Sequence, residues 1–156
     1  MAAPHGANEK IDPRGPRFGA AITSVLLAAT IALYPVSPVV ALLLLLVQTA
    51  AFAAGSLIGL QAQPWGIVYR KLVRPRLQSP AELEDAAPPR FAQGVGLAFA
   101  LVGVLGWVLA APVLFYVAIG FALVAALLNA VFDFCLGCEV YLLGKRLRQR
   151  TADAAS

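Results

Sequence analysis

Residues 112–134 have the sequence PVLFYVAIGFALVAALLNAVFDF, and residues 135–139 continue it as CLGCE. This last apolar run decides the fold, because a helix of that length, at about 1.5 Å of rise per residue, crosses the roughly 30 Å hydrocarbon core of a bilayer. The run therefore predicts a membrane-spanning helix. The only two cysteines of the chain, Cys135 and Cys138, then lie where that helix meets water.

The composition of the chain indicates an integral membrane protein. Of its 156 residues, 60% are hydrophobic and 13% are charged, and the mean hydropathy is +0.80. Soluble domains are about 45–50% apolar and about 25% charged. The net charge of +4 comes from clusters at the termini and in one loop. Because these clusters lack the interleaved aromatic residues of a nucleic-acid-binding patch, we expect no nucleic-acid partner.

Three further apolar runs precede the last one. A two-proline break at residues 34–38 follows the first run, and Ala111-Pro112 forms a hinge before the last. The sequence therefore predicts an all-α polytopic membrane protein with four transmembrane helices, arranged as two tandem helical hairpins. The predicted spans are residues 18–33, 39–60, 91–110 and 112–134, within a membrane domain of residues 17–147. The predicted tails are residues 1–16, which we expect to be mobile, and residues 148–156.

The loop between the two hairpins, residues 64–90, changes character along its length. Residues 64–78 carry two aromatic and four basic residues, which predicts an amphipathic segment at the membrane surface. Next, Ser79-Pro80-Ala81-Glu82 matches a capping box, in which the serine caps the start of a helix and the glutamate side chain accepts from the backbone N–H of the serine. We therefore expect a short acidic helix over residues 79–87 that stops at Pro88-Pro89.

The distribution of basic residues predicts the orientation of the chain. An even number of spans places both termini on one side, and the turns at residues 34–38 and 110–112 hold no charge. The positive-inside rule then predicts cytoplasmic termini and a cytoplasmic middle loop, in the inner (plasma) membrane. The basic residues that decide this are Lys10, Arg14, Arg17, Arg70, Lys71, Arg74, Arg76, Arg90, Lys145, Arg146, Arg148 and Arg150.

The two halves of the chain resemble each other, which predicts an internal repeat. Residues 16–18 and residues 89–91 both have the sequence PRF, at an offset of 73. Residues 63–69 match residues 135–141 at an offset of 72, and basic residues follow both segments. Because each copy contains two spans, the copies would share one orientation and be related by an axis along the membrane normal.

The cysteine pair is the most chemically specific feature of the sequence. Helical spacing puts Cys135 and Cys138 on one face, close enough to form a disulfide. Glu139 can move a proton during thiol exchange, although its charge also disfavours a thiolate. Asp133 marks a functional position, because a carboxylate is costly inside a membrane. We take Cys135, Cys138, Glu139 and Asp133 as the candidate catalytic residues.

The predicted position of the pair works against its reactivity. At the C-terminal end of a span, the negative end of the helix dipole disfavours the thiolate. Reactive Cys-X-X-Cys pairs usually lie at a helix N-terminus instead. Only a new helix that began at Gly137 would reverse this effect.

The residues leave three roles open for the pair. The first is thiol–disulfide or persulfide exchange. The second is a metal site, for which Cys135 and Cys138 supply half of a zinc ligand set; His5, the only histidine, is distant, and a homo-oligomer could supply the other half. The third is a structural role. Gln63 and Gly66 occupy the matching positions of the first copy, so a hairpin of this kind does not require cysteines at these positions. We predict no cofactor and no metal ion.

Three motifs connect the chain to a known family. They are Asp12-Pro13-Arg14, the two PRF sequences, and residues 134–141, which contain a Cys-X-Gly-Cys-Glu-X-Tyr motif. Over residues 11–147 the sequence resembles small bacterial four-span membrane proteins, common in actinobacteria, that are catalogued as a domain of unknown function. Members of that family are often encoded near thioredoxin-like and rhodanese-type sulfurtransferase proteins. The resemblance therefore implies a partner that handles sulfur or thiol redox.

Two functions follow as hypotheses. The first is an integral membrane thiol redox or sulfur-relay protein, whose cysteine pair exchanges with a cytoplasmic thioredoxin-like or rhodanese-type protein. The second is a non-enzymatic membrane scaffold or subunit, whose basic loop and acidic helix dock such a partner. The expected partners are thus the lipid bilayer, a cytoplasmic protein of this kind and, for the metal hypothesis, a second copy of the chain.

Overall fold

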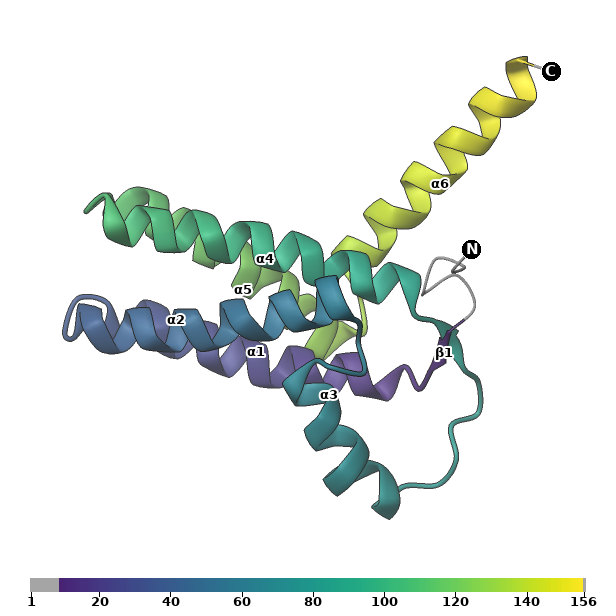
Figure 1. The fold of residues 1–156 in the computed structure, drawn as a ribbon, viewed down its shortest axis with the longest axis horizontal. Coiled ribbons are helices and arrows are strands. Elements are labelled where there is room, and N and C mark those ends of the chain that lie inside the picture. The colour runs from purple at the N-terminus through teal and green to yellow at the C-terminus, as the bar shows by residue number, and fades with distance from the viewer. Residues whose placement is uncertain (1–8, 156) are drawn as a thin grey trace.

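The structure is a computed structural model that describes residues 9–155, and Figure 1 shows its elements along the chain. The α-helices are α1 (Arg14–Leu33), α2 (Pro38–Ala53), α3 (Pro64–Val68), α4 (Ala87–Val108), α5 (Pro112–Phe132) and α6 (Leu136–Ala155). The shorter elements are the π-helices η1 (Ala54–Ile58) and η2 (Tyr69–Val73), the 3₁₀-helix η3 (Arg74–Arg76), and the strands β1 (Lys10–Ile11) and β2 (Glu84–Asp85).

Four of these helices are long and apolar enough to cross a membrane: α1, α2 with η1, α4 and α5. Prolines lie in the first turn of α2, α4 and α5, where the missing N–H group has no helical partner to lose. The all-α prediction of four spans in two hairpins is confirmed. The chain is a multi-pass membrane protein, with large apolar side chains such as Val113 and Phe121 exposed on its outer faces.

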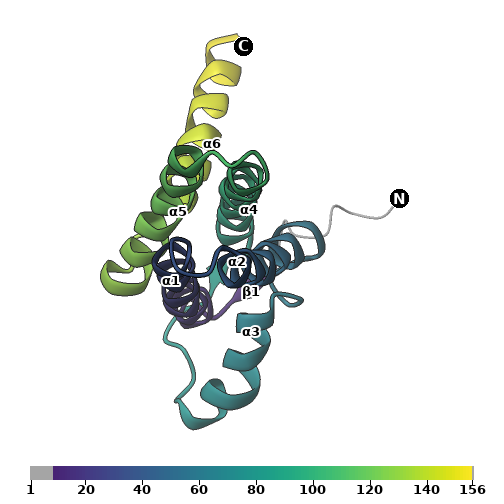
Figure 2. The ribbon, with the colours of Figure 1, turned by 90° about the vertical axis from the view of Figure 1, so that its left-hand side faces the viewer.

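The four spans stand at the corners of a square when the bundle is viewed along its axis (Figure 2). Helix α1 packs against α2 and α5, and α4 packs against the same two helices. Helices α1 and α4 are therefore diagonal to each other, as are α2 and α5. Between them lie fully buried side chains, the largest of which are Leu27, Leu45, Phe115 and Ile119.

The acidic helix predicted over residues 79–87 is wrong. Residues 78–83 form no helix, and Glu84–Asp85 pairs as β2 with β1, so that Lys10 faces Asp85 and Ile11 faces Glu84. A helix of nine residues without a buried face is not stable alone, and the strand from the other half of the chain offers hydrogen bonds instead. Pro88 and Pro89, expected to stop a helix, lie in the first turn of α4.

Two helical segments leave the same end of the bundle (Figure 1). One consists of α3, η2 and η3, which follow the first hairpin, and the other is α6, which follows the second. Helix α6 continues to Ala155, so residues 148–155 are helical where the sequence predicted a tail. Of the predicted N-terminal tail, residues 9–16 contain β1 and the start of α1. The mobility predicted for residues 1–8 lies outside the described residues.

Matched aromatic contacts recur in the two halves. Phe18 lies 5.8 Å from Tyr69 between ring centroids, and Phe91 lies 5.7 Å from Tyr141, with interplanar angles of 44° and 48°. The phenylalanines are 73 residues apart and the tyrosines 72. Each pair joins the start of a hairpin to the helical segment that follows the same hairpin.

Matched polar contacts accompany them. Arg17 of α1 donates to the carbonyl oxygen of Ala130 near the end of α5, and Arg90 of α4 donates to that of Ser56 in η1. In each case an arginine of a PRF sequence bonds carbonyl groups at the end of the other hairpin. Since α1 and α4 are diagonal, these are the contacts that a two-fold axis along the bundle would exchange.

Candidate functional site

The cysteine motif begins where α5 ends. Helix α5 stops at Phe132, and Asp133 follows in the left-handed conformation, with φ of +56°. Aspartate tolerates this conformation better than most residues, so it can end a helix there. The chain then turns, and α6 starts at Leu136. The predicted span to residue 134 is therefore two residues too long, and Cys135 directly precedes a new helix.

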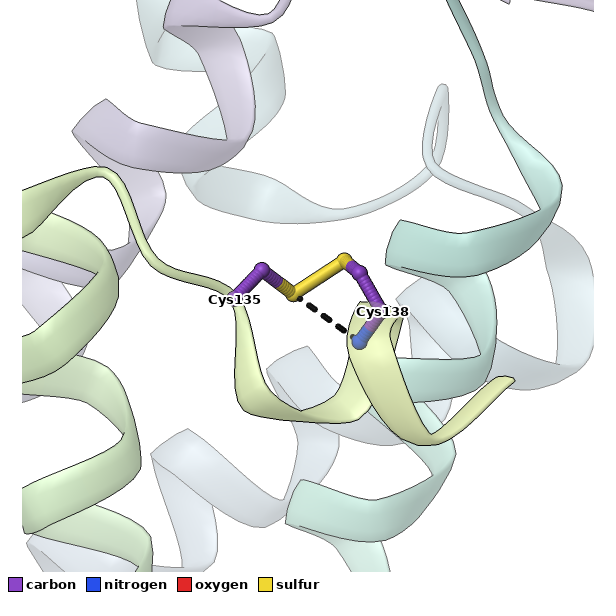
Figure 3. The surroundings of a disulfide bond; sticks show 2 residues. All are labelled: Cys135 and Cys138. Atoms are coloured by element: carbon purple, nitrogen blue, oxygen red, sulfur yellow. Dashed lines mark hydrogen bonds between the residues drawn. A yellow bond between two sulfur atoms is a disulfide. The ribbon is translucent and has the colours of Figure 1, made fainter. Parts of the chain in front are cut away.

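Cys135 and Cys138 form a disulfide at the start of α6 (Figure 3). Their Cα atoms are 5.2 Å apart, and the backbone N–H of Cys138 donates to Sγ of Cys135 over 3.3 Å. The sulfur takes the place of the side-chain oxygen that usually caps a helix by accepting from the third backbone N–H. Both cysteines are partly exposed.

Helix α4 holds the start of α6 in place. A Cβ atom on Gly137 would lie 2.6 Å from Cβ of Ala92, which means that α6 approaches α4 more closely than a side chain permits. One turn further, the ring of Tyr141 packs on Phe91. The disulfide thus lies on a packed helix rather than on a free terminus, although the α4 residues that contact this helix precede it by more than 40 positions in the sequence.

The two candidate carboxylates are both exposed. Glu139 lies in the first turn of α6, where negative charge is favourable, and its backbone N–H donates to the carbonyl oxygen of Cys135. Asp133 lies in the turn, two residues before Cys135, and its conformation ends α5. Within residues 9–155, no hydrogen bond or ion pair joins the side chain of either carboxylate to another group.

The new helix reverses the electrostatic expectation for the pair. The sequence placed the cysteines at the C-terminal end of a span, but the structure places them at the N-terminal end of α6. There the unpaired N–H groups and the positive end of the helix dipole stabilise a thiolate. The signal that reveals this is Asp133, a residue type that can adopt positive φ and end the preceding helix.

Comparison with known families matches residues 11–146 to a family model described as Domain of unknown function (DUF4395). The match covers most of the chain. The protein belongs to the DUF4395 family. No curated protein and no solved structure matches the chain.

The DUF4395 chain also holds a polar cluster that sequence reasoning missed. The carboxylate of Asp12 lies 2.8 Å from the Arg14 guanidinium and accepts a hydrogen bond of 3.0 Å from the Tyr69 hydroxyl. The hydrogen bonds from Arg14 outweigh burial and lower the pKa of Asp12 to about 2, whereas burial raises the pKa of Tyr69. The offset of 73 between Asp12 and Asp85 is the sequence signal that could have found this cluster.

Asp85, the counterpart of Asp12, makes one of the same contacts. Its Oδ1 atom accepts from the backbone N–H of Ala87 over 3.0 Å, and Asp12 accepts from that of Arg14 over the same distance. Each aspartate therefore forms a turn directly before the first helix of its hairpin and accepts from the first backbone N–H of that helix. In this DUF4395 protein the two halves share that turn, and within residues 9–155 the first half adds hydrogen bonds from an arginine and a tyrosine side chain to it.

Proposed function

We propose that this membrane protein is a thiol redox or sulfur-relay protein, in which Cys135 and Cys138 cycle between dithiol and disulfide. The observation that supports this proposal is the bonded pair at the N-terminus of α6, with the Cys138 N–H directed at the Cys135 sulfur. In the reduced protein the same N–H and the helix dipole would favour the Cys135 thiolate. Cys135 is therefore the attacking thiol in this proposal.

The exchange balances in two steps. The Cys135 thiolate attacks one sulfur of a partner disulfide, and the other partner sulfur leaves as a thiolate. Cys138, after giving its proton to Glu139 or water, attacks the Cys135 sulfur and releases the second partner thiolate. The pair loses two electrons and two protons, which the partner gains. With a rhodanese-type partner, the Cys135 thiolate instead takes the outer sulfur of a partner persulfide and releases the partner's thiolate.

The proposed partner is cytoplasmic, thioredoxin-like or of the rhodanese type. Helix α6 and the α3–η3 segment leave the same end of the bundle, and both are basic (Figure 1). The positive-inside rule favours the cytoplasmic side of the inner membrane for that end. Labelling of the cysteines in intact cells with a membrane-impermeant maleimide tests this orientation, since cytoplasmic thiols react only after permeabilisation.

Trapping tests the chemistry. The Cys138→Ser variant removes the second thiol, so a mixed disulfide through Cys135 should accumulate with its partner under mild oxidation. The matched control is Cys135→Ser, which leaves the less activated thiol and should trap several-fold less. Absence of any mixed disulfide, or equal trapping by both variants, would contradict the proposal.

We also propose that the two hairpins arose by duplication, with the dithiol as a specialisation of the second. The paired Phe–Tyr contacts, the paired arginine contacts and the diagonal placement of α1 and α4 support this. The first copy carries Gln63 and Gly66 at the cysteine positions. Because the first copy forms its helix start without sulfur, the thiols are not needed to build the scaffold.

A scaffold function is the second candidate, favoured by the exposed basic side chains of Arg70, Lys71 and Arg74. The docking surface in this version consists of η2 and η3 alone, since residues 79–87 form no acidic helix. Replacing the three residues by glutamate should then weaken capture of the partner, while the double variant Cys135→Ser with Cys138→Ser should capture it normally. The opposite pattern favours the thiol relay.

A further inference from the structure

A second candidate site lies in the half of the molecule that has no cysteines. A partly open cavity of about 240 Å³ is lined by β1 and the start of α1, by the chain from Leu60 to Arg74, and by the first turns of α4. Its walls include Gln63 and Gly66, the positions that match the two cysteines. The first half therefore contains a cavity at the place where the second half carries its disulfide.

The cavity has an excess of positive charge. Lys10, Arg70 and Arg74 line it, together with Glu9 and Asp12. The negative charge of Asp12 is already neutralised by an arginine of α1 at 2.8 Å, which is not part of the lining. One carboxylate, Glu9, thus remains against three cations. Such a lining favours an anion, and arginine side chains in particular favour phosphate or carboxylate groups.

One wall of the cavity offers a hydrogen-bond acceptor that has no donor. The Oε1 atom of Gln93 is buried and, among the residues that the structure describes, meets no donor. A buried carbonyl oxygen of this kind costs free energy unless something donates to it. Gln93 is one of the residues that line the cavity, and we take its Oε1 atom as the acceptor for a hydroxyl or amine group of a ligand.

Gly66 lies in the cavity wall beside Arg70. A Cβ atom at this position would lie 3.4 Å from Nη1 of Arg70 and 3.2 Å from the carbonyl oxygen of Leu60. A side chain here would therefore occupy the space in front of the guanidinium. The cavity is also smaller than the roughly 300–1,000 Å³ pockets of drug-sized ligands, which limits the ligand to a small polar group.

We propose that this cavity binds a phosphate ester that also carries a hydroxyl group, such as a glycerol phosphate group. Arg70 and Arg74 bind the phosphate, and the hydroxyl donates to Oε1 of Gln93. Two sources offer this chemistry: free glycerol phosphate, and the headgroup of phosphatidylglycerol. The cavity lies at the end of the membrane-spanning helices, where lipid headgroups and soluble molecules can both reach it.

The test uses the full-length protein and two probes. Binding of sn-glycerol 1-phosphate is measured by calorimetry in a nonionic detergent, and lipid binding by native mass spectrometry of protein from nanodiscs of phosphatidylglycerol and phosphatidylcholine. Arg74→Gln should weaken binding by about tenfold or more, since it removes a charge-assisted hydrogen bond. Gln93→Leu should weaken it by about threefold to tenfold. The matched control Arg148→Gln removes an equal charge from exposed α6 and should change binding less than twofold.

The outcomes separate the two sources and can overturn the proposal. Arg74-dependent binding of free glycerol phosphate indicates a soluble ligand, and Arg74-dependent retention of phosphatidylglycerol alone indicates a lipid headgroup. The proposal is wrong if neither probe binds, or if Arg148→Gln weakens binding as much as Arg74→Gln. If Arg74→Gln fails to fold, Lys10→Gln on the exposed strand β1 provides the same comparison. The double cysteine variant should bind normally, because the cavity does not depend on the thiols.

Discussion

The two halves of the bundle end in the same way and with different chemistry. At the start of α3, Oε1 of Gln63 accepts from the backbone N–H of Gly66 over 2.6 Å. At the start of α6, Sγ of Cys135 accepts from the backbone N–H of Cys138. The fold needs only an acceptor at this position, and an amide provides it. The two helix starts therefore share a hydrogen-bond geometry and differ in chemistry, because the second carries a disulfide where the first carries an amide.

The halves also differ where each first helix begins. The Asp12 side chain binds the side chains of Arg14 and Tyr69 in addition to the first N–H of α1, whereas within residues 9–155 the Asp85 side chain binds only the first N–H of α4. The first half therefore depends on a charged cluster beside its cavity. The second half depends on close packing of α6 on α4. A substitution can remove each of these two features separately, and a matched residue elsewhere in the chain provides the control.

The largest effect should come from Asp12→Asn. This change removes the negative charge that faces Arg14 and should lower the free energy of unfolding by about 1.5–3 kcal/mol, because the carboxylate is nearly buried. Asp85→Asn keeps a side-chain oxygen that accepts from the backbone N–H of Ala87 and should cost less than about 0.5 kcal/mol. Thermal unfolding of both variants in detergent measures the difference. Equal losses would show that the two halves are not specialised at this position.

The next effect concerns the close approach of α6. Gly137→Ala forces a methyl group against Ala92 and should cost about 1–3 kcal/mol of stability. Gly144→Ala is the matched control on the same helix, where no other atom lies within 4 Å, and alanine there should stabilise α6 by up to about 1 kcal/mol. Unfolding temperatures and the fraction of disulfide formed report both changes. A stabilising Gly137→Ala would contradict the packing of α6 on α4.

A pH profile sharpens the contrast between the halves. The pKa of Asp12 is lowered from 3.8 to about 2 by its hydrogen bonds to Arg14. The stability that this shift contributes is therefore complete above about pH 4 and is lost as the pH falls toward 2. For the native chain, the unfolding temperature should fall steeply as the pH is lowered from 5 to 2. Asp12→Asn should flatten that slope, and an unchanged slope would assign it to other groups.

The smallest effect should come from Glu139. Replacing it by glutamine removes a negative charge near Cys135 and should lower the pKa of that thiol by less than about one unit. The pH dependence of alkylation by iodoacetamide measures this pKa in the Cys138→Ser background. Asp153→Asn, at the far end of α6, should leave it unchanged. A rise in the thiol pKa would mean that Glu139 does not act through its charge.

The four spans could be predicted from the sequence because each is a local property. An apolar run of about 20 residues must cross the bilayer, and prolines in the first turns of α2 and α5 set where those helices begin. The cysteine pair was equally visible, as was the likeness of the PRF sequences. These features depend on neighbours along the chain, so no knowledge of distant residues was required to find them.

The features that decide the chemistry come from contacts between distant residues. The capping box at Ser79 predicted a helix, but Glu84–Asp85 pairs with the strand Lys10–Ile11 instead. Helix α6 starts beside α4 because Gly137 fits against Ala92, and no local pattern specifies that contact.

The amino-acid sequence by itself therefore determined a four-span membrane protein with a dithiol after its last span, since hydrocarbon thickness and residue spacing act locally. Tertiary structure alone decided that the start of α6 packs on α4 and that the first half contains a cationic cavity. Both depend on residues more than 40 positions apart in the sequence, which only the packed bundle brings together.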